Sequence, residues 1–313
     1  MLDKRLIIVA GKGGVGRTTV AAALATLYAR HGRRVLLAHV RTRQRVGEQL
    51  GCGPIDEMIR EVEPNLWAVN MNPRAALREQ GLKVLRFKAV YNAVMENRLV
   101  KYFLRAIPSL DEYSMLGKAW YHTTEVDEDG HPRFETVIFD GPATGHLVTM
   151  LRIPQVILDV VPEGPLTRDA LLVHELLVDP VRTSMWIVTL AEEMAISEAT
   201  DLYHAARDDL KITPGLLVVN ALYPDTFERE PRLAAAFERL VGREDQLDPR
   251  LGPLIAATQT LRSRREINRL HLDRVAREVP LPTVQLPQLF IPSLDRAALD
   301  TLAVLLEPAV CSG

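Results

Sequence analysis

The segment Gly11–Thr19 (GKGGVGRTT) carries the residue types that bind phosphate. Its glycines let the backbone curl so that amide N–H groups converge on phosphate oxygens, and a following helix adds its dipole at the same point. The hydroxyl of Thr18 is suited to a Mg²⁺ ion. An apolar run at 6–10 precedes the segment and an alanine-rich stretch follows it, which is the strand–loop–helix context of such a loop. The sequence therefore predicts a nucleotide-binding site here.

One position departs from the usual phosphate loop. The pattern G-x-x-x-x-G-K-[ST] has lysine at its seventh position, and this chain has Arg17. Lysine is a compact point charge, whereas the arginine side chain is longer and planar and is not equivalent to it. Arginine still binds phosphate through two hydrogen bonds. We therefore expect nucleotide binding to survive while the geometry for hydrolysis suffers.

The elements that would position this loop alternate along the chain. Several short apolar runs show no polar alternation, which is typical of strands buried on both faces of a parallel sheet. Strand–helix alternation predicts an α/β fold with a doubly wound, mainly parallel sheet and right-handed crossovers. The predicted strands are 6–10, 35–40, 66–70, 136–140, 184–190, 215–220 and 283–286.

One interval breaks this rhythm. Residues 73–121 have a mostly helical pattern, so we expect a single domain over 1–313 with a helical insertion at 73–121. The stretch DEDGHP (127–132) predicts a turn back into the sheet. A second helical block is expected from 226 to 279, broken near Pro249 and Pro253.

Composition excludes several classes of protein. A formal net charge of -2 gives no global attraction to nucleic acid or an anionic membrane. Cys52 and Cys311 have no metal or redox spacing, so neither a disulfide framework nor a zinc site is expected from them. No apolar run approaches the roughly 18–20 residues of a membrane span. The sequence predicts a cytoplasmic protein.

The second residue of the loop makes the motif more specific. GKGGVG-x-TT resembles the variant phosphate loop of the deviant Walker ATPases, which include the nitrogenase iron protein, the septum-site and partition ATPases, and the arsenite-efflux and tail-anchored-protein targeting ATPases. The resemblance implies that Lys12 reaches across a dimer interface to the partner's nucleotide. There its charge would neutralise the transferred phosphoryl group. A solvated loop lysine is the alternative.

The stretch FDGPATGHLVTMLRIP (139–154) narrows the resemblance to the arsenite-efflux and tail-anchored-targeting family, because it is similar to that family's switch II motif, D-T-A-P-T-G-H. The resemblance implies that Asp140 holds Mg²⁺ through a water, and that the segment from Gly145 moves with the γ-phosphate. Pro142 lies one position earlier than the proline of the family motif. Asn220 matches the family's adenine-reading asparagine, whose amide both donates and accepts; a strand-terminal cap is the alternative.

Two departures from the family bear on activity. When VLLAHVRTRQRVGEQLG (35–51) is aligned with the family's switch I, the aspartate that would orient the attacking water falls on Arg41. The basic patch Arg41–Arg45 is a surface turn, a phosphate clamp or a small nucleic-acid patch. The sequence lacks the cysteine cluster of the arsenite-efflux ATPases, and it also lacks the C-x-x-C motif of many tail-anchored-protein targeting ATPases. Arsenite export is therefore not expected.

The resemblance as a whole implies a dimeric ATPase that uses ATP and Mg²⁺, with slow or partner-dependent hydrolysis. The dimer partner is a second copy or a related ATPase. Alternatives are a non-hydrolysing subunit that activates or scaffolds a relative and, more remotely, a partition-like DNA-associated ATPase. Apolar residues of the insertion form either a packed core or a groove for a protein client. The predicted nucleotide-binding residues are Gly11, Lys12, Gly13, Gly14, Val15, Gly16, Arg17, Thr18, Thr19 and Asn220, with Lys12 and Arg17 catalytic and with Thr18 and Asp140 as Mg²⁺ ligands.

Overall fold

The computed structural model describes residues 2–40, 45–72, 110–241 and 248–311. Its centre is an eight-stranded sheet in the order β3-β4-β2-β5-β1-β6-β7-β8. Every neighbouring pair is parallel except β3 and β4, which are antiparallel. The strands are β1 (Leu6–Ala10), β2 (Val35–Val40), β3 (Arg60–Glu63), β4 (Leu66–Met71), β5 (Thr136–Asp140), β6 (Thr183–Leu190), β7 (Pro214–Leu222) and β8 (Thr283–Pro287).

The predicted fold class and all seven predicted strands are confirmed, with ends shifted by at most two residues. The apolar runs form strands because both faces of the sheet are covered: β1 and β5 are buried along their whole length. Strand β3 was missed. Its sequence, REVE, is short and charged, which suits an exposed sheet edge and gives no hydrophobic pattern to read.

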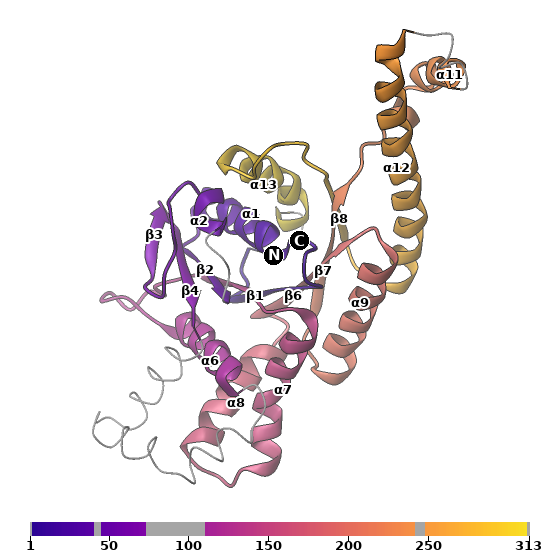
Figure 1. The fold of residues 1–313 in the computed structure, drawn as a ribbon. Helices are drawn as coiled ribbons and strands as arrows, with labels where there is room; N and C mark the ends of the chain where they lie inside the picture. The colour runs from indigo at the N-terminus through magenta and orange to yellow at the C-terminus, as the bar shows by residue number, and fades with distance from the viewer. Residues whose placement is uncertain (1, 41–44, 73–109, 242–247, 312–313) are drawn as a thin grey trace.

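Helices cover both faces of the sheet (Figure 1). One face packs against α1 (Arg17–Arg30), α2 (Arg45–Gln49) and α13 (Arg296–Cys311), and its core includes the fully buried Trp186. The other face packs against α6 (Leu110–Thr124), α7 (Thr144–Val160), α8 (Pro165–Val178) and α9 (Glu193–His204), which continues into the short turn η1 (Ala205–Asp209). The carboxyl ends of β1, β2 and β5 thus meet between the two helical layers, where ligands of open α/β sheets bind.

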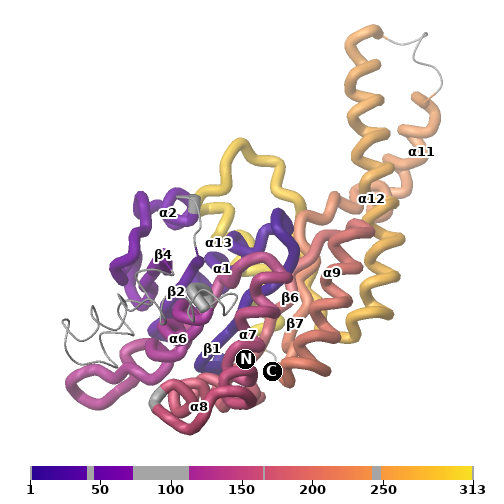
Figure 2. Tube along the Cα trace, turned by 60° about the horizontal axis from the view of Figure 1, so that its bottom comes forward, coloured from indigo at the N-terminus to yellow at the C-terminus, as the bar shows by residue number. Residues whose placement is uncertain are grey.

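The second helical block forms an arm that extends away from the sheet (Figures 1 and 2). It consists of α10 (Thr226–Arg229), α11 (Pro231–Leu240), η3 (Pro249–Leu251) and the long α12 (Gly252–Glu278). The break predicted near Pro249 is confirmed as a separate short helix. The break near Pro253 is also present, because α12 begins at Gly252 and this proline lies in its first turn, where a missing N–H costs no hydrogen bond.

Other expectations meet the structure only in part. The turn at 127–132 is confirmed by the hydrogen bond from the Gly130 N–H to the Asp127 carbonyl. Most of the predicted insertion, from 73 to 109, lies outside the described residues, so the insertion, its client groove and the single-domain assignment stay predictions. Among the described residues, no helix has the length and apolar character needed to cross a membrane.

Candidate nucleotide site

The predicted phosphate loop lies between β1 and α1, and its backbone requires glycine at several positions. Gly14 and Gly16 have φ angles of 89° and 92°, which L side chains rarely adopt. A Cβ atom on Gly11 would lie 2.2 Å from the carbonyl oxygen of Val188 in β6, and one on Gly16 would lie 2.2 Å from the amide nitrogen of Asn220. The loop therefore packs so closely on β6 and β7 that only glycine fits.

Thr18 and Asp140 meet at the carboxyl ends of β1 and β5. The Thr18 hydroxyl donates to Oδ2 of Asp140 at 2.6 Å. The other carboxylate oxygen, Oδ1, is buried and has no hydrogen-bond partner among the described residues. Burial raises the pKa of the Asp140 carboxyl to about 6, against the opposing effects of the Thr18 hydrogen bond and the Arg17 charge. A buried carboxylate with an unused oxygen beside a threonine hydroxyl is a donor set that fits Mg²⁺.

Arg17 is held by the loop that follows β5, in the segment that resembles switch II. Its Nη1 donates to the carbonyl oxygen of Gly141 at 2.8 Å and to that of Pro142. Burial lowers the pKa of the guanidinium, and the nearby Asp140 carboxylate opposes this shift. The sequence indicated phosphate as the partner of Arg17. In the structure the long planar side chain instead ties the first residue of α1 to the loop that follows β5.

Lys12 also has a partner within its own chain. Its Nζ lies 2.8 Å from Oε1 of Glu198, on α9, and the two side chains are 27% and 39% exposed. The predicted role across a dimer interface would require this pair to open. A pair this exposed contributes roughly 0–1 kcal/mol, so opening it costs little.

Asn220, in β7, contacts the phosphate loop directly. Its Nδ2 donates to the carbonyl oxygen of Val15 at 2.9 Å. This bond uses one of the two amide N–H groups, so the carbonyl oxygen and the second N–H of Asn220 can still face a base. The carbonyl oxygen accepts from the exocyclic amino group of adenine, whereas guanine carries a carbonyl oxygen at that position.

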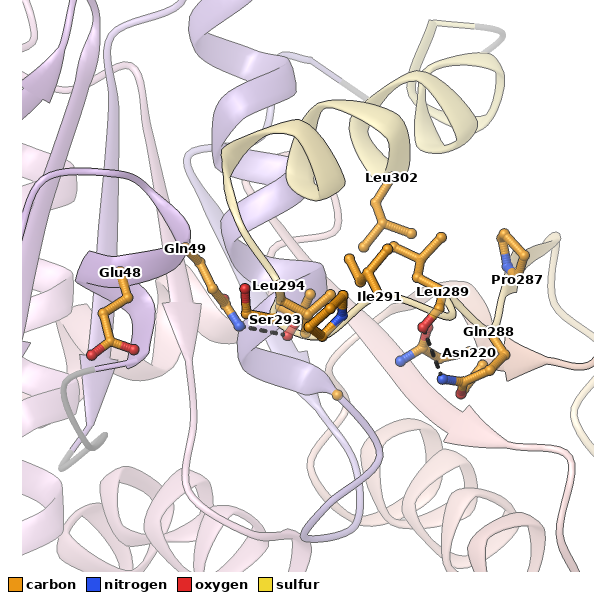
Figure 3. Close-up of a pocket in the computed structure, with 14 residues that line it drawn as sticks. Glu48, Gln49, Asn220, Pro287, Gln288, Leu289, Ile291, Ser293, Leu294 and Leu302 are labelled. Atoms are coloured by element: carbon orange, nitrogen blue, oxygen red, sulfur yellow. Dashed lines mark hydrogen bonds between the residues drawn. The ribbon is translucent and has the colours of Figure 1, made fainter.

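A cavity of about 540 Å³ opens beside the loop (Figure 3). It is lined by Gly16, Thr19 and Asn220 on the side of the loop, and by the segment from Pro287 to Leu294 across from it. This volume lies in the range of small-molecule sites, about 300–1,000 Å³. Gln49, on α2, also lines the cavity and donates to the Thr19 hydroxyl at 3.3 Å; sequence reasoning missed it.

His39 is a second residue that the sequence did not single out. It lies one residue before the end of β2, in register with Asp140 on the neighbouring β5. It is 1% exposed, and neither ring nitrogen has a hydrogen-bond partner among the described residues. Burial lowers its pKa to about 4, so its ring is neutral at pH 7. His39 lies inside the apolar run of β2, so its position in the sequence indicated only a strand residue and not a residue of the site.

The structure thus brings Gly11–Thr19, Asp140 and Asn220 to one end of the sheet. Gly145 and His146 lie in the exposed first turn of α7, which directly follows the carbonyls that Arg17 binds. Arg41 and the rest of the basic patch up to 44 lie outside the described residues, so no base or clamp is assigned there.

Comparison with known proteins agrees with this geometry. The family model described as anion-transporting ATPase matches residues 4–163, just over half of the chain. The matched part contains the phosphate loop, the Thr18–Asp140 pair and switch II.

Three curated relatives illustrate the range of similarity. ATPase BagA of Mycobacterium tuberculosis is 27% identical over 263 residues, which are 82% of this chain and 75% of BagA. An arsenical pump-driving ATPase of Acidiphilium multivorum is 27% identical over 248 residues, 72% of this chain but only 41% of the pump protein. ATPase ASNA1 homolog 1 of Paramecium tetraurelia is 27% identical over 154 residues, 48% of this chain and 44% of the homolog.

Proposed function

The chain belongs to the anion-transporting ATPase family, and we propose that it binds ATP with Mg²⁺ in the site between β1, β5 and β7 and uses the nucleotide as a conformational switch. The observation that carries this proposal is the contact between Thr18 and Asp140 at the base of the phosphate loop, with a second Asp140 oxygen buried and unused. Mg²⁺ bound there would neutralise phosphate charge.

Each part of the site then has a defined task. The backbone N–H groups of the loop and of the first turn of α1 bind phosphate oxygens. The Thr18 hydroxyl and the Asp140 carboxylate hold the metal ion, and Asn220 selects the base. Switch II begins directly after Asp140, so a change in the phosphate or the metal is transmitted to it through the chain itself.

The first test is nucleotide affinity and selectivity. Calorimetry with Mg²⁺ should show binding of ATP, and Asn220→Ala should weaken it about 5- to 30-fold, because one or two hydrogen bonds contribute roughly 1–2 kcal/mol. The same change should reduce the preference for ATP over GTP, since it removes the oxygen that accepts from adenine.

Asn65→Gly is the matched control, because Asn65 lies in the turn before β4 at φ 67°, where glycine fits. It should leave both affinities unchanged. Failure of the wild-type protein to bind ATP at millimolar concentration would contradict the assignment of the site.

The contacts of Arg17 favour slow turnover. Its guanidinium is occupied by the carbonyls of Gly141 and Pro142, so it stabilises one position of switch II in addition to any phosphate it binds. Hydrolysis would require both tasks to be satisfied in one geometry. This observation also favours the second candidate, a subunit that binds nucleotide without hydrolysing it and regulates a related ATPase. Turnover of the purified protein, measured beside its ATP affinity, separates the two.

Dimerisation is the second test. We propose that ATP brings two chains, or this chain and a relative, face to face, and that Lys12 then leaves Glu198 for the partner's nucleotide. Light scattering should show a dimer with a non-hydrolysable ATP analogue. Lys12→Ala should lower turnover by an order of magnitude or more, because a cation at the transferred phosphoryl group contributes at least this much.

Glu198→Ala provides the comparison. If the ion pair only holds Lys12 before the dimer forms, turnover should change less than about fivefold, which corresponds to roughly 1 kcal/mol. A protein that stays monomeric with every nucleotide, or a Glu198→Ala variant as impaired as Lys12→Ala, would contradict a role of Lys12 across the interface.

A further inference from the structure

Three side chains of metal-binding type meet at the end of α1 that is remote from the phosphate loop. His31 caps α1, and Glu307 and Cys311 lie four residues apart on one face of α13, which packs against α1 (Figure 1). Nε2 of His31 lies 2.9 Å from Oε1 of Glu307 and 3.7 Å from Sγ of Cys311. All three ligand atoms lie within 4.8 Å of one another.

These distances are close to those of a tetrahedral zinc site. Bonds of about 2.0 Å from zinc to nitrogen or oxygen and about 2.3 Å to sulfur place the ligand atoms roughly 3.3–3.6 Å apart. The His31–Glu307 pair would have to open by less than half an ångström from its 2.9 Å, and the 3.7 Å His31–Cys311 separation is already close. The third separation, between Glu307 and Cys311, is at most 4.8 Å, so side-chain rotations can bring all three ligand atoms to one ion.

The ligand set also limits the metal. One imidazole, one thiolate and one carboxylate suit a borderline-soft divalent ion such as Zn²⁺ or Co²⁺, whereas Mg²⁺ and Ca²⁺ take oxygen ligands. A simple ion pair between His31 and Glu307 would account for two of the three groups but gives no reason for the thiol to lie against the same ring nitrogen. The spacing of the cysteines could not indicate these three ligands, because His31 lies 276 residues before Glu307 in the sequence.

The surrounding charges leave the cluster available. Arg30 is paired with Asp300 at 2.6 Å, and Arg33 is paired with Glu135 at 3.0 Å, so each of these neighbouring cations has a carboxylate partner outside the cluster. His31 lies at the C-terminal end of α1, where the helix dipole places a partial negative charge, and this favours a bound cation.

We propose that His31, Glu307 and Cys311 form a binding site for one divalent zinc-type ion, with water completing its coordination. The ion would connect two helices that both reach the nucleotide site at their other ends. Helix α1 begins in the phosphate loop, and α13 follows the segment from Pro287 to Leu294 that lines the cavity. The site itself is separate from the proposed nucleotide site and does not depend on it.

Cobalt titration of the chelator-treated protein tests the proposal. Co²⁺ should bind one per chain and produce both the ligand-field bands of low-symmetry cobalt and a thiolate charge-transfer band. Cys311→Ser should remove the charge-transfer band, and His31→Ala and Glu307→Gln should each weaken binding roughly tenfold or more. Zn²⁺ should displace Co²⁺ and raise the melting temperature of the wild-type protein more than that of these three variants.

Cys52→Ser is the matched control, since Cys52 is the chain's other thiol and its Sγ donates to the carbonyl oxygen of Gly53. This variant should retain the band and the affinity. Absence of the band in the wild-type protein, its persistence in Cys311→Ser, or a stoichiometry of one ion per two chains would overturn the proposal. Circular dichroism of each variant shows whether the fold is intact, and Glu307→Gln changes one charge with almost no change in shape.

Discussion

The double variant Arg17→Lys with Arg41→Asp should hydrolyse ATP about 10²-fold faster than the wild-type protein, or more. The two changes restore the two positions at which the chain departs from the family pattern. A carboxylate that orients or deprotonates the attacking water contributes roughly 10²–10⁴-fold to the rate. Lysine at 17 would give up the two carbonyls of switch II and place a point charge at the phosphates instead.

The matched control is Arg17→Lys with Arg43→Asp, which makes the same change in charge two residues away. Steady-state turnover with saturating ATP should rise only in the first variant. Equal rates in the two double variants, or a wild-type rate as high as that of the double variant Arg17→Lys with Arg41→Asp, would show that the alignment of Arg41 with the water-orienting aspartate is wrong. Arg17→Lys alone should increase amide exchange in residues 141–146, because it releases the tie to switch II.

The fold was accessible from the sequence because burial leaves a direct signature. Strands covered on both faces must be apolar along their whole length, and β1 and β5 are fully buried as their sequences indicated. Strand β3 left no such signature, because an edge strand is half exposed and three of its four residues are charged. The break near Pro249 and Pro253 was also predictable, because proline fits the first turn of a helix, where Pro253 lies.

The contacts of the candidate site were predictable where the ends of strands fix the positions of residues. They were less predictable for long side chains, which can reach several partners. The approach of Thr18 to Asp140 follows from the neighbouring places of β1 and β5. The partners of Arg17 and Lys12 do not follow from any spacing. Glu198 lies far along the chain from Lys12, and a guanidinium reaches carbonyls or phosphates equally well. The His31–Glu307–Cys311 cluster likewise exists only because α1 and α13 pack together.

Two buried ionisable groups at the site predict opposite dependences of stability on pH. Burial holds the pKa of Asp140 at about 6, above its ordinary value, so the native carboxyl binds a proton that the unfolded one has lost. Its contribution to stability therefore increases as the pH falls from 7 toward 4. Burial holds the pKa of His39 at about 4, below its ordinary value, so the unfolded ring is protonated first and its contribution decreases over the same range.

Asp140→Asn should therefore separate the two effects. At pH 7 and without metal ions it should raise the free energy of unfolding by roughly 1–3 kcal/mol, because about two pKa units of desolvation cost are removed. The asparagine oxygen can still accept from Thr18. As the pH falls toward 4.5, this variant should lose more stability than the wild-type protein, because His39 still titrates and the offsetting gain at Asp140 is gone. His39→Gln should instead lose less stability than the wild-type protein on acidification, so the wild-type slope should lie between those of the two variants.

The measurement is urea unfolding at pH 7.5, 6.0 and 4.5 with a chelator present. The readout is the slope of stability against pH, since packing changes in either variant shift the absolute values but not the direction of the slope. Asp201→Asn, a change at an exposed carboxylate on α9, serves as the control and should follow the wild-type profile. Parallel profiles for Asp140→Asn and His39→Gln would contradict the burial-driven shifts at both residues. Divergent profiles would show that the nucleotide-free protein stores an unfavourable charge at Asp140, the position at which a metal ion would relieve it.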